Sequence, residues 1–425
     1  VNDTKSGGTL SERAINNYQY SNGNNHFNIY GKTGYVFADN TYKSFGFQWS
    51  LSNYNNKAQY GSRNYKGNEK TGYFNFIYQS IIGSEVHKFR TGMSFVFDQF
   101  KETFLTNSYN RIEKVPGAFF EYTFAPFEEF SVIAGVRADK HNYYGLMLTP
   151  RIHFRYSPDE SWVFRGVAGK GYRTSNIFTE FPSAFASSRE VNIDAVENFG
   201  YGLKQEQAWN YGFNFMHYFY YEYREGTISV DLYRTNFIQS TIGDLDSNPQ
   251  QINFSSVNNG AYSNSLQVEL NMQPLENFDT RIAYRYMDVK QKIAGKMLER
   301  SFSSKNRALI NLAYSTEKEN VEDAQMVYDL TVQWFDKKRI PSTLSNPVEF
   351  RAKEYSPAFF LVNTQITRKF SMNFDVYLGI ENLLDFRQKD IILDPFNPNS
   401  QYFDASLIWG PTNGRMVYAG FRFKM

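Results

Sequence analysis

The sequence predicts an all-β protein, a transmembrane antiparallel β-barrel, and three observations support this fold class. Aromatic residues make up 18% of the 425 residues, whereas the charged fraction (21%) and the apolar fraction (41%) are ordinary. Apolar and polar residues alternate along many segments, so the mean hydropathy stays at −0.54 although one face of each segment is apolar. Short and long connections between these segments also alternate along the chain.

The composition excludes several other classes. The chain has no cysteine, so it holds no disulfide, no thiolate metal site and no cysteine nucleophile. A formal net charge of +2 provides no basic field for nucleic acid, which is therefore not an expected partner. The abundance of aromatic residues argues against disorder. No run approaches the roughly 18 apolar residues that a membrane helix needs.

Strict alternation with a period of two predicts the individual strands. Segment 327–334 places Tyr328, Leu330, Val332 and Trp334 on one face and polar residues on the other. Many such segments exceed the five or six residues usual for strands of soluble sheets. We predict about seventeen strands by this period-two rule, near residues 25–37, 42–54, 70–82, 86–100, 112–124, 129–142, 146–157, 160–171, 205–220, 226–242, 258–272, 277–291, 305–316, 325–337, 355–369, 371–385 and 414–425.

The predicted connections fall into a short and a long set. Short turns are expected at 38–40, 82–85, 125–128, 157–160, 273–276 and 368–371. Long loops are expected near 55–69, 172–204, 243–257, 292–304, 338–354 and 386–413, with intermediate connections at 143–145 and 317–324. Outer-membrane barrels have short periplasmic turns and long extracellular loops. A soluble sandwich has no reason for such a two-sided pattern, so the connections favour the barrel.

The order of the strands predicts how the chain is organised. If the last strand ends at the periplasm, counting back makes residues 1–24 an extracellular loop segment and residues 25–425 the barrel domain. Closed bacterial barrels of a single chain have an even number of strands, whereas we count an odd number. We therefore expect the chain to be the C-terminal portion of a larger barrel.

Four groups of residues resemble conserved segments of one family, the TonB-dependent outer-membrane receptors of Gram-negative bacteria. They span about residues 130–425 and stand in the family's order. They are AGVRADKH at 134–141 with LTPRI at 148–152, VFRGVAGKGYRTSN at 163–176, GIENLLD at 379–385, and WGP at 409–411 with YAGFRF at 418–423.

The resemblance implies a 22-stranded barrel in the outer membrane, with a plug domain in its lumen that this sequence would lack. It also implies a receptor that is not an enzyme and that imports a scarce solute actively. That solute would be a metal chelate, such as a siderophore or cobalamin, or an oligosaccharide. The implied partners are outer-membrane lipid, the protein's own plug, the TonB energy-transducing complex and, in some relatives, a surface lipoprotein. A passive porin is the alternative.

Two sets of residues are candidates for contact with a solute. The first set is expected to face the lumen and to contact the plug or the substrate, and it comprises Arg137, Arg151, Arg165 and Arg285. The lumen is expected because an arginine at mid-depth on the lipid face would cost about 2–4 kcal/mol. Most aromatic residues should form girdles at the two membrane interfaces. The second set would instead form a ligand-binding extracellular mouth, and it comprises Tyr143, Tyr144, Tyr172, Arg173, Phe178, Phe181, Phe185 and Arg189.

The sequence offers little metal or catalytic chemistry. The five histidines are scattered, with no two at a ligand spacing. Asp244, Asp246 and Asn248 match the first three ligand positions of a calcium loop, but Pro249 and Ser255 stand where glycine and glutamate are needed. We expect no cofactor, leave Ca²⁺ open for the outer loops, and predict no catalytic residue.

Overall fold

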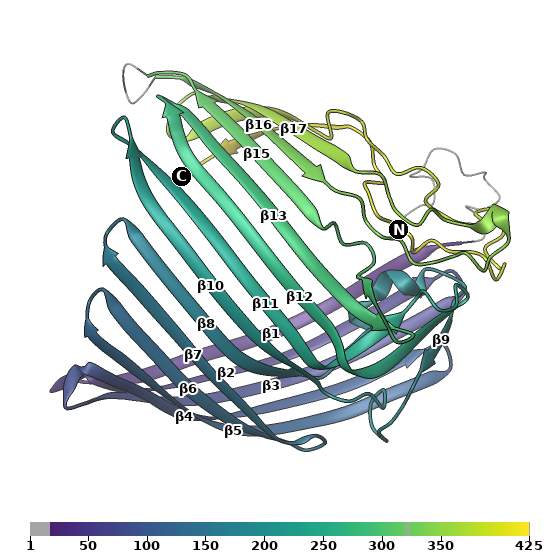
Figure 1. Ribbon diagram of the computed structural model, residues 1–425, viewed down its shortest axis with the longest axis horizontal. Helices are drawn as coiled ribbons and strands as arrows, with labels where there is room; N and C mark the ends of the chain where they lie inside the picture. Colours follow the sequence, from purple (N-terminus) through teal and green to yellow (C-terminus); the bar gives the residue numbers. More distant parts are fainter. Residues whose placement is uncertain (1–17, 319, 321–322, 425) are drawn as a thin grey trace.

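The computed structural model describes residues 18–318, 320 and 323–424. In these residues nineteen strands form one sheet, which Figure 1 shows as strongly curved. The strands are β1 (Tyr20–Phe37), β2 (Asn40–Tyr60), β3 (Arg63–Ile82), β4 (Ser84–Phe104), β5 (Asn107–Phe127), β6 (Phe130–His141), β7 (Gly145–Asp159), β8 (Trp162–Arg173), β9 (Glu190–Ile193), β10 (Glu206–Tyr221), β11 (Arg224–Asp244), β12 (Gln251–Leu275), β13 (Phe278–Ile293), β14 (Lys296–Glu299), β15 (Asn306–Ser315), β16 (Gln325–Phe335), β17 (Phe359–Lys369), β18 (Phe374–Glu381) and β19 (Met416–Phe423).

The long strands pair in sequence order, each antiparallel to the next. Pairing runs without a break from β1 to β8, continues from β8 to β10 and from β13 to β15, and ends at β19. The short β9 adds to β12 in parallel, and β14 forms a small hairpin with β13. Among the described residues no pairing joins β1 to β19, so the sheet is open at these two edges.

The helices are short and belong to the connections. They are α2 (Ile177–Glu180) and η2 (Pro182–Phe185) between β8 and β9, and η3 (Val348–Phe350) between β16 and β17. In the described residues, no helix is long and apolar enough to cross a membrane.

The predicted fold class is confirmed, and each of the seventeen predicted strands corresponds to a long strand. Some connections differ. The long loop expected at 55–69 is wrong, because β2 and β3 continue as a paired hairpin to a tight turn at Gly61, whose φ of +60° suits glycine. The loops expected at 243–257 and 292–304 are shortened by β11, β12 and β14. Polar residues in these segments suggested loops, but a strand that projects beyond the membrane can be polar on both faces.

The start of the chain differs from the prediction in one respect. The first strand begins at Tyr20, so the loop segment expected over residues 1–24 ends earlier than predicted. Its residues 1–17 lie outside the described part.

The two faces of the sheet differ as a membrane barrel requires. On β10 and β11, Phe213 lies opposite Leu232 on the outer face, where both side chains are exposed. The next pair, Asn214 and Asp231, lies on the inner face and is joined by a hydrogen bond of 2.8 Å. At the turn between these strands, Tyr223 is fully exposed, as expected of an aromatic girdle at a membrane interface.

A charge placed on the outer face should destabilise the barrel, whereas a charge on the inner face should not. Leu232 lies near the middle of β11, so Leu232→Arg should lower the free energy of unfolding in lipid vesicles by about 2–4 kcal/mol. Ser229→Arg on the same strand is the matched control, because Ser229 pairs with Glu269 on the inner face. Guanidinium titration of both variants measures the difference, and equal losses would show that the faces are assigned wrongly.

Candidate functional site

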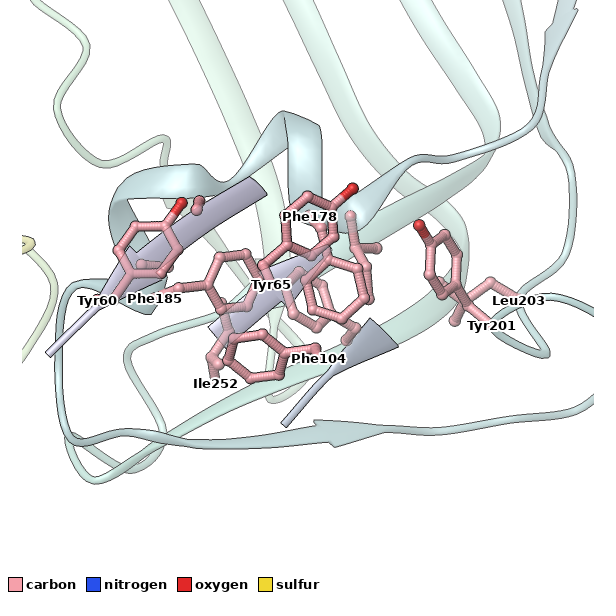
Figure 2. Close-up of a cluster of buried hydrophobic side chains, with 12 residues drawn as sticks. Tyr60, Tyr65, Phe104, Phe178, Phe185, Tyr201, Leu203 and Ile252 are labelled. Atoms are coloured by element: carbon pink, nitrogen blue, oxygen red, sulfur yellow. The ribbon is translucent and has the colours of Figure 1, made fainter. Parts of the chain in front are cut away.

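The connection between β8 and β10 folds back onto the inner face of the sheet, at the end of the strands that carries the long connections. This mouth loop, residues 174–205, carries α2, η2 and β9. Its Phe178 ring lies 5.3 Å from that of Tyr65 on β3 and 5.1 Å from that of Phe104 on β4, centroid to centroid. Figure 2 shows Phe178 and Phe185 pointing into this buried group. The loop therefore has a hydrophobic core of its own, shared with the strand ends.

Two predicted mouth residues belong to this core, and a third packs against it. The exposed fractions are 4% for Phe178 and 1% for Phe185, while Phe181 packs against the cluster with its ring 5.2 Å from that of Phe254. In this conformation they offer a solute little surface. Their burial supports a role as anchors of the loop, and direct contact with a ligand stays a prediction.

A buried charge network lies beside the aromatic core. Arg111 on β5 donates from Nε to Glu113 at 2.7 Å and lies 3.8 Å from Glu102 on β4. The mouth loop joins this network through Asn176, which accepts a hydrogen bond from Arg111, and through Tyr201, whose hydroxyl donates to Glu102. The loop is therefore held to the wall by polar contacts as well as by apolar packing.

Burial, and secondarily the charge of Glu102, raises the pKa of the Tyr201 hydroxyl far above its ordinary value of 10. An unfolded tyrosine loses its proton near pH 10, whereas this buried one keeps it. The stabilisation is therefore complete below pH 10 and is lost as the pH rises above that value. Hydrogen exchange of the mouth-loop amides should speed up above pH 10, after correction for the intrinsic rate, more than exchange in Tyr201→Phe. An equal increase in both proteins would contradict this assignment.

Two further buried ion pairs connect the outer loops to one another. Arg189 in the mouth loop, whose side chain is 2% exposed, binds Asp404 in the β18–β19 connection with Nη2 to Oδ2 at 3.0 Å. It also donates to the carbonyl of Leu245 in the β11–β12 connection at 3.1 Å. That connection is in turn fixed through Asp246, whose carboxylate lies 2.5 Å from Arg339 in the β16–β17 connection. Four outer loops thus form one linked layer.

The remaining mouth residues keep more of their surface. Tyr143 stacks on Phe199 with ring centroids 4.1 Å apart, and the Tyr144 hydroxyl donates to the Leu203 carbonyl at 3.1 Å. Arg173 has a side chain that is 58% exposed and pairs with Glu180 at 3.0 Å and with Glu206. The structure brings Tyr144 and Tyr172 together at a cavity of about 240 Å³, lined also by Lys204, Gln205, Gln207 and Gln239.

The four predicted lumen arginines lie on the inner face of the sheet but have different partners. Arg137 pairs with Asp139 at 2.6 Å, and Arg151 pairs with Glu121. Arg165 donates to the neutral amide of Asn214 at 2.9 Å. Arg285 lies directly opposite another arginine, Arg307, on β15. Contact of these four residues with a plug or a substrate stays a prediction.

The calcium-like sequence makes other contacts. The Asp244 carboxylate accepts hydrogen bonds from the backbone of Asp246 and Ser247, at 2.8 and 2.9 Å, and Asp246 binds Arg339. Over the described ranges, no group of three or more His, Asp or Glu side chains is placed to hold a metal ion. Calcium in the outer loops stays a prediction.

Sequence reasoning missed the partners that hold the mouth together. Arg189 is among the predicted mouth residues, but its partner Asp404 lies 215 positions away, and no local pattern marks the pairing. The sequence does carry a signal for Glu102 and Arg111. They bear opposite charges at the outer ends of two neighbouring strands and share the inner face, where such charges can pair.

The chain resembles known proteins in sequence and in fold. A model of the TonB-dependent receptor-like β-barrel matches residues 2–383. The pyoverdine outer-membrane receptor FpvA from Pseudomonas aeruginosa is similar in structure, with a TM-score of 0.67 and 11% identity over 98% of this chain and 64% of that one. For the siderophore receptor PirA from Acinetobacter baumannii the values are 0.64 and 12%, over 95% and 62%. For the alcaligin receptor FauA from Bordetella pertussis they are 0.58 and 14%, over 86% and 61%.

The sequence identities and coverages determine what the comparisons establish. At such low identity, the structural likeness shows the fold alone. The chain spans less than two thirds of each of these three receptors. No curated protein sequence matches it. The family match, which covers most of the chain, confirms the resemblance seen in the sequence. The chain therefore belongs to the TonB-dependent receptor-like β-barrel family and lies in the outer membrane of a Gram-negative bacterium.

Proposed function

We propose that the full-length protein binds a scarce solute at its outer face and imports it actively into the periplasm. The observation that carries this proposal is the family match over residues 2–383. Energy would come from the inner membrane through TonB, acting on a plug domain in the lumen. The protein would act as a receptor and transporter, not as an enzyme.

The proposed solute is a metal chelate of the siderophore or cobalamin type, with an oligosaccharide as the other candidate. The names of the similar structures support the first choice, since they describe receptors for pyoverdine, alcaligin and other siderophores. Tyr143, Tyr144, Tyr172 and Arg173 are the proposed contacts, because they lie at the mouth and are less buried than the aromatic anchors. A surface lipoprotein remains a proposed partner.

A passive porin is the second candidate. A loop folded against the inner face is what a porin uses to narrow its pore, and residues 174–205 fold in this way. The family match nevertheless favours the receptor.

Uptake of radiolabelled ferric siderophores by cells that carry the full-length gene separates the two candidates. A receptor should accumulate its solute against a gradient, and a protonophore should stop this accumulation while leaving surface binding intact. Uptake that only equilibrates, with an unchanged rate after the protonophore, would support the porin and contradict the proposal. Tyr172→Ala should weaken binding, whereas Tyr211→Ala, which changes an exposed tyrosine on the outer face of β10, is the matched control.

A further inference from the structure

Most inner-face arginines of the described strands have a carboxylate partner in the wall itself. These are Arg90, Arg111, Arg137, Arg151, Arg173, Arg281 and Arg422. Among the exceptions, Arg63 on β3 donates instead to the Ser188 carbonyl of the mouth loop at 3.0 Å. Four others form two directly opposed pairs, Arg155 with Arg165 on β7 and β8, and Arg285 with Arg307 on β13 and β15. Among the described ion pairs, none includes any of these four residues. Like charges placed directly opposite each other destabilise a sheet, so the exceptions call for a cause.

The two pairs differ in how well they are satisfied by neutral groups. Arg165 donates to Asn214 at 2.9 Å, and Arg155 donates to the Glu128 carbonyl at 3.4 Å. Arg307 has a buried Nε without any hydrogen-bond partner. An unsatisfied buried donor is costly, and more so when it carries charge. The pair on β13 and β15 therefore lacks the neutral hydrogen-bond acceptors that the pair on β7 and β8 has.

A third cation lies beside this second pair. Lys338, in the β16–β17 connection, is close enough to Arg307 for the guanidinium to act on it, and burial together with that charge lowers the pKa of Lys338. Its ammonium lies 5.7 Å from the centre of the Phe335 ring, and the Arg307 guanidinium lies 5.2 Å from the same centre. Three cations thus gather at the outer ends of β15 and β16, opposite the middle of β13, where Arg285 lies.

An aromatic wall borders two of the three cations, Arg307 and Lys338. The ring of Phe359 stacks between those of Phe335, at 5.0 Å, and Phe386, at 4.8 Å. Phe359 is 4% exposed, whereas Phe335 and Phe386 are partly exposed, so the centre of the wall is shielded from water. Beside such a wall, electrostatic attraction is screened less than in water.

We propose that Arg285, Arg307 and Lys338 form a binding site for one oxyanion group, a carboxylate or a phosphate. Two guanidinium groups can hold such a group through charge-assisted hydrogen bonds, and the ammonium adds a third positive charge. The anion belongs either to the imported solute or to the segment of the same protein that fills the lumen. The first source rests on the proposed function, and the second does not require transport.

Calorimetric titration of the purified full-length protein with benzoate and with neutral benzamide tests the site. The two probes share a ring and differ in charge, so benzoate should bind more tightly. The double variant R285Q/R307Q should bind benzoate at least tenfold more weakly, as expected for the loss of hydrogen bonds to a charged group. R281Q is the matched control, because Arg281 lies on the same strand with its own partner, Glu269. R285K/R307K keeps both charges and should retain most of the binding.

The source of the anion follows from a second measurement on the same proteins. If wild type does not bind benzoate but R285Q/R307Q speeds hydrogen exchange in the lumen segment, while R281Q does not, the anion comes from that segment. If R285Q/R307Q changes neither benzoate binding nor this exchange, the proposal is overturned. Binding of benzoate by a full-length protein that shows no energy-dependent uptake would refute the proposed transport and leave the anion site intact.

Discussion

Replacing Arg189 by methionine should release the mouth loop and lower its free energy of local opening by roughly 3–5 kcal/mol. The change leaves the Asp404 carboxylate, whose side chain is 6% exposed, buried without its cation. It also leaves the carbonyls of Leu245 and Gln251 without their donor. Hydrogen exchange of amides in residues 174–205 measures the loss, because local opening reports on such contacts directly.

The double variant R189M/D404L is the control for this prediction. When both charges of a buried pair are replaced by apolar side chains, the net cost is often small. We therefore expect the double variant to recover at least half of the lost opening energy. Exchange in R189M as slow as in wild type would mean that the outer loops are not linked through this ion pair.

Truncation of Phe185 should have an effect of similar size for a different reason. Phe185 is 1% exposed, and its ring lies 5.1 Å from those of Phe104 and Phe178. Phe185→Ala removes a buried ring and leaves a cavity, which costs about 3–5 kcal/mol in protein cores. The loss should appear as faster exchange in α2 and η2 and as a new site of proteolytic cleavage in the loop.

Phe181→Ala is the matched control, since it removes the same group from the same loop. Phe181 only packs against the edge of the cluster, so its loss should cost less than half as much. Equal effects of the two variants would contradict the assignment of Phe185 as the central anchor. Deletion of the whole loop would be a poor test of binding, because it would also remove the core that the strand ends share.

The fold could be predicted from the sequence because its cause is local. One face of each membrane strand meets lipid, so apolar and polar residues alternate, and this pattern can be read along the whole strand. The prediction failed where this cause stops. In segment 55–69 the outer face meets water instead of lipid, while Tyr60 and Tyr65 on the inner face pack against the mouth loop. Lys57 and Lys66 therefore pair within a hairpin that composition alone describes as a loop.

The mouth could be predicted only in part because its causes are distant in sequence. Loop length and aromatic content indicated a functional segment, and Tyr144 and Tyr172 do meet at a cavity. The same signals could not separate anchors from contacts. Phe178 is buried only because Tyr65 and Phe104 lie on neighbouring strands, and Arg189 is buried only because Asp404 returns to it from a late loop.

The proposed import depends most directly on coupling to TonB. The decisive measurement compares solute binding and accumulation in two strains that both carry the full-length protein, one with TonB and one without. We predict equal binding at the cell surface in the two strains and accumulation in the periplasm only in the strain with TonB. Equal accumulation in both strains would contradict active import by this protein.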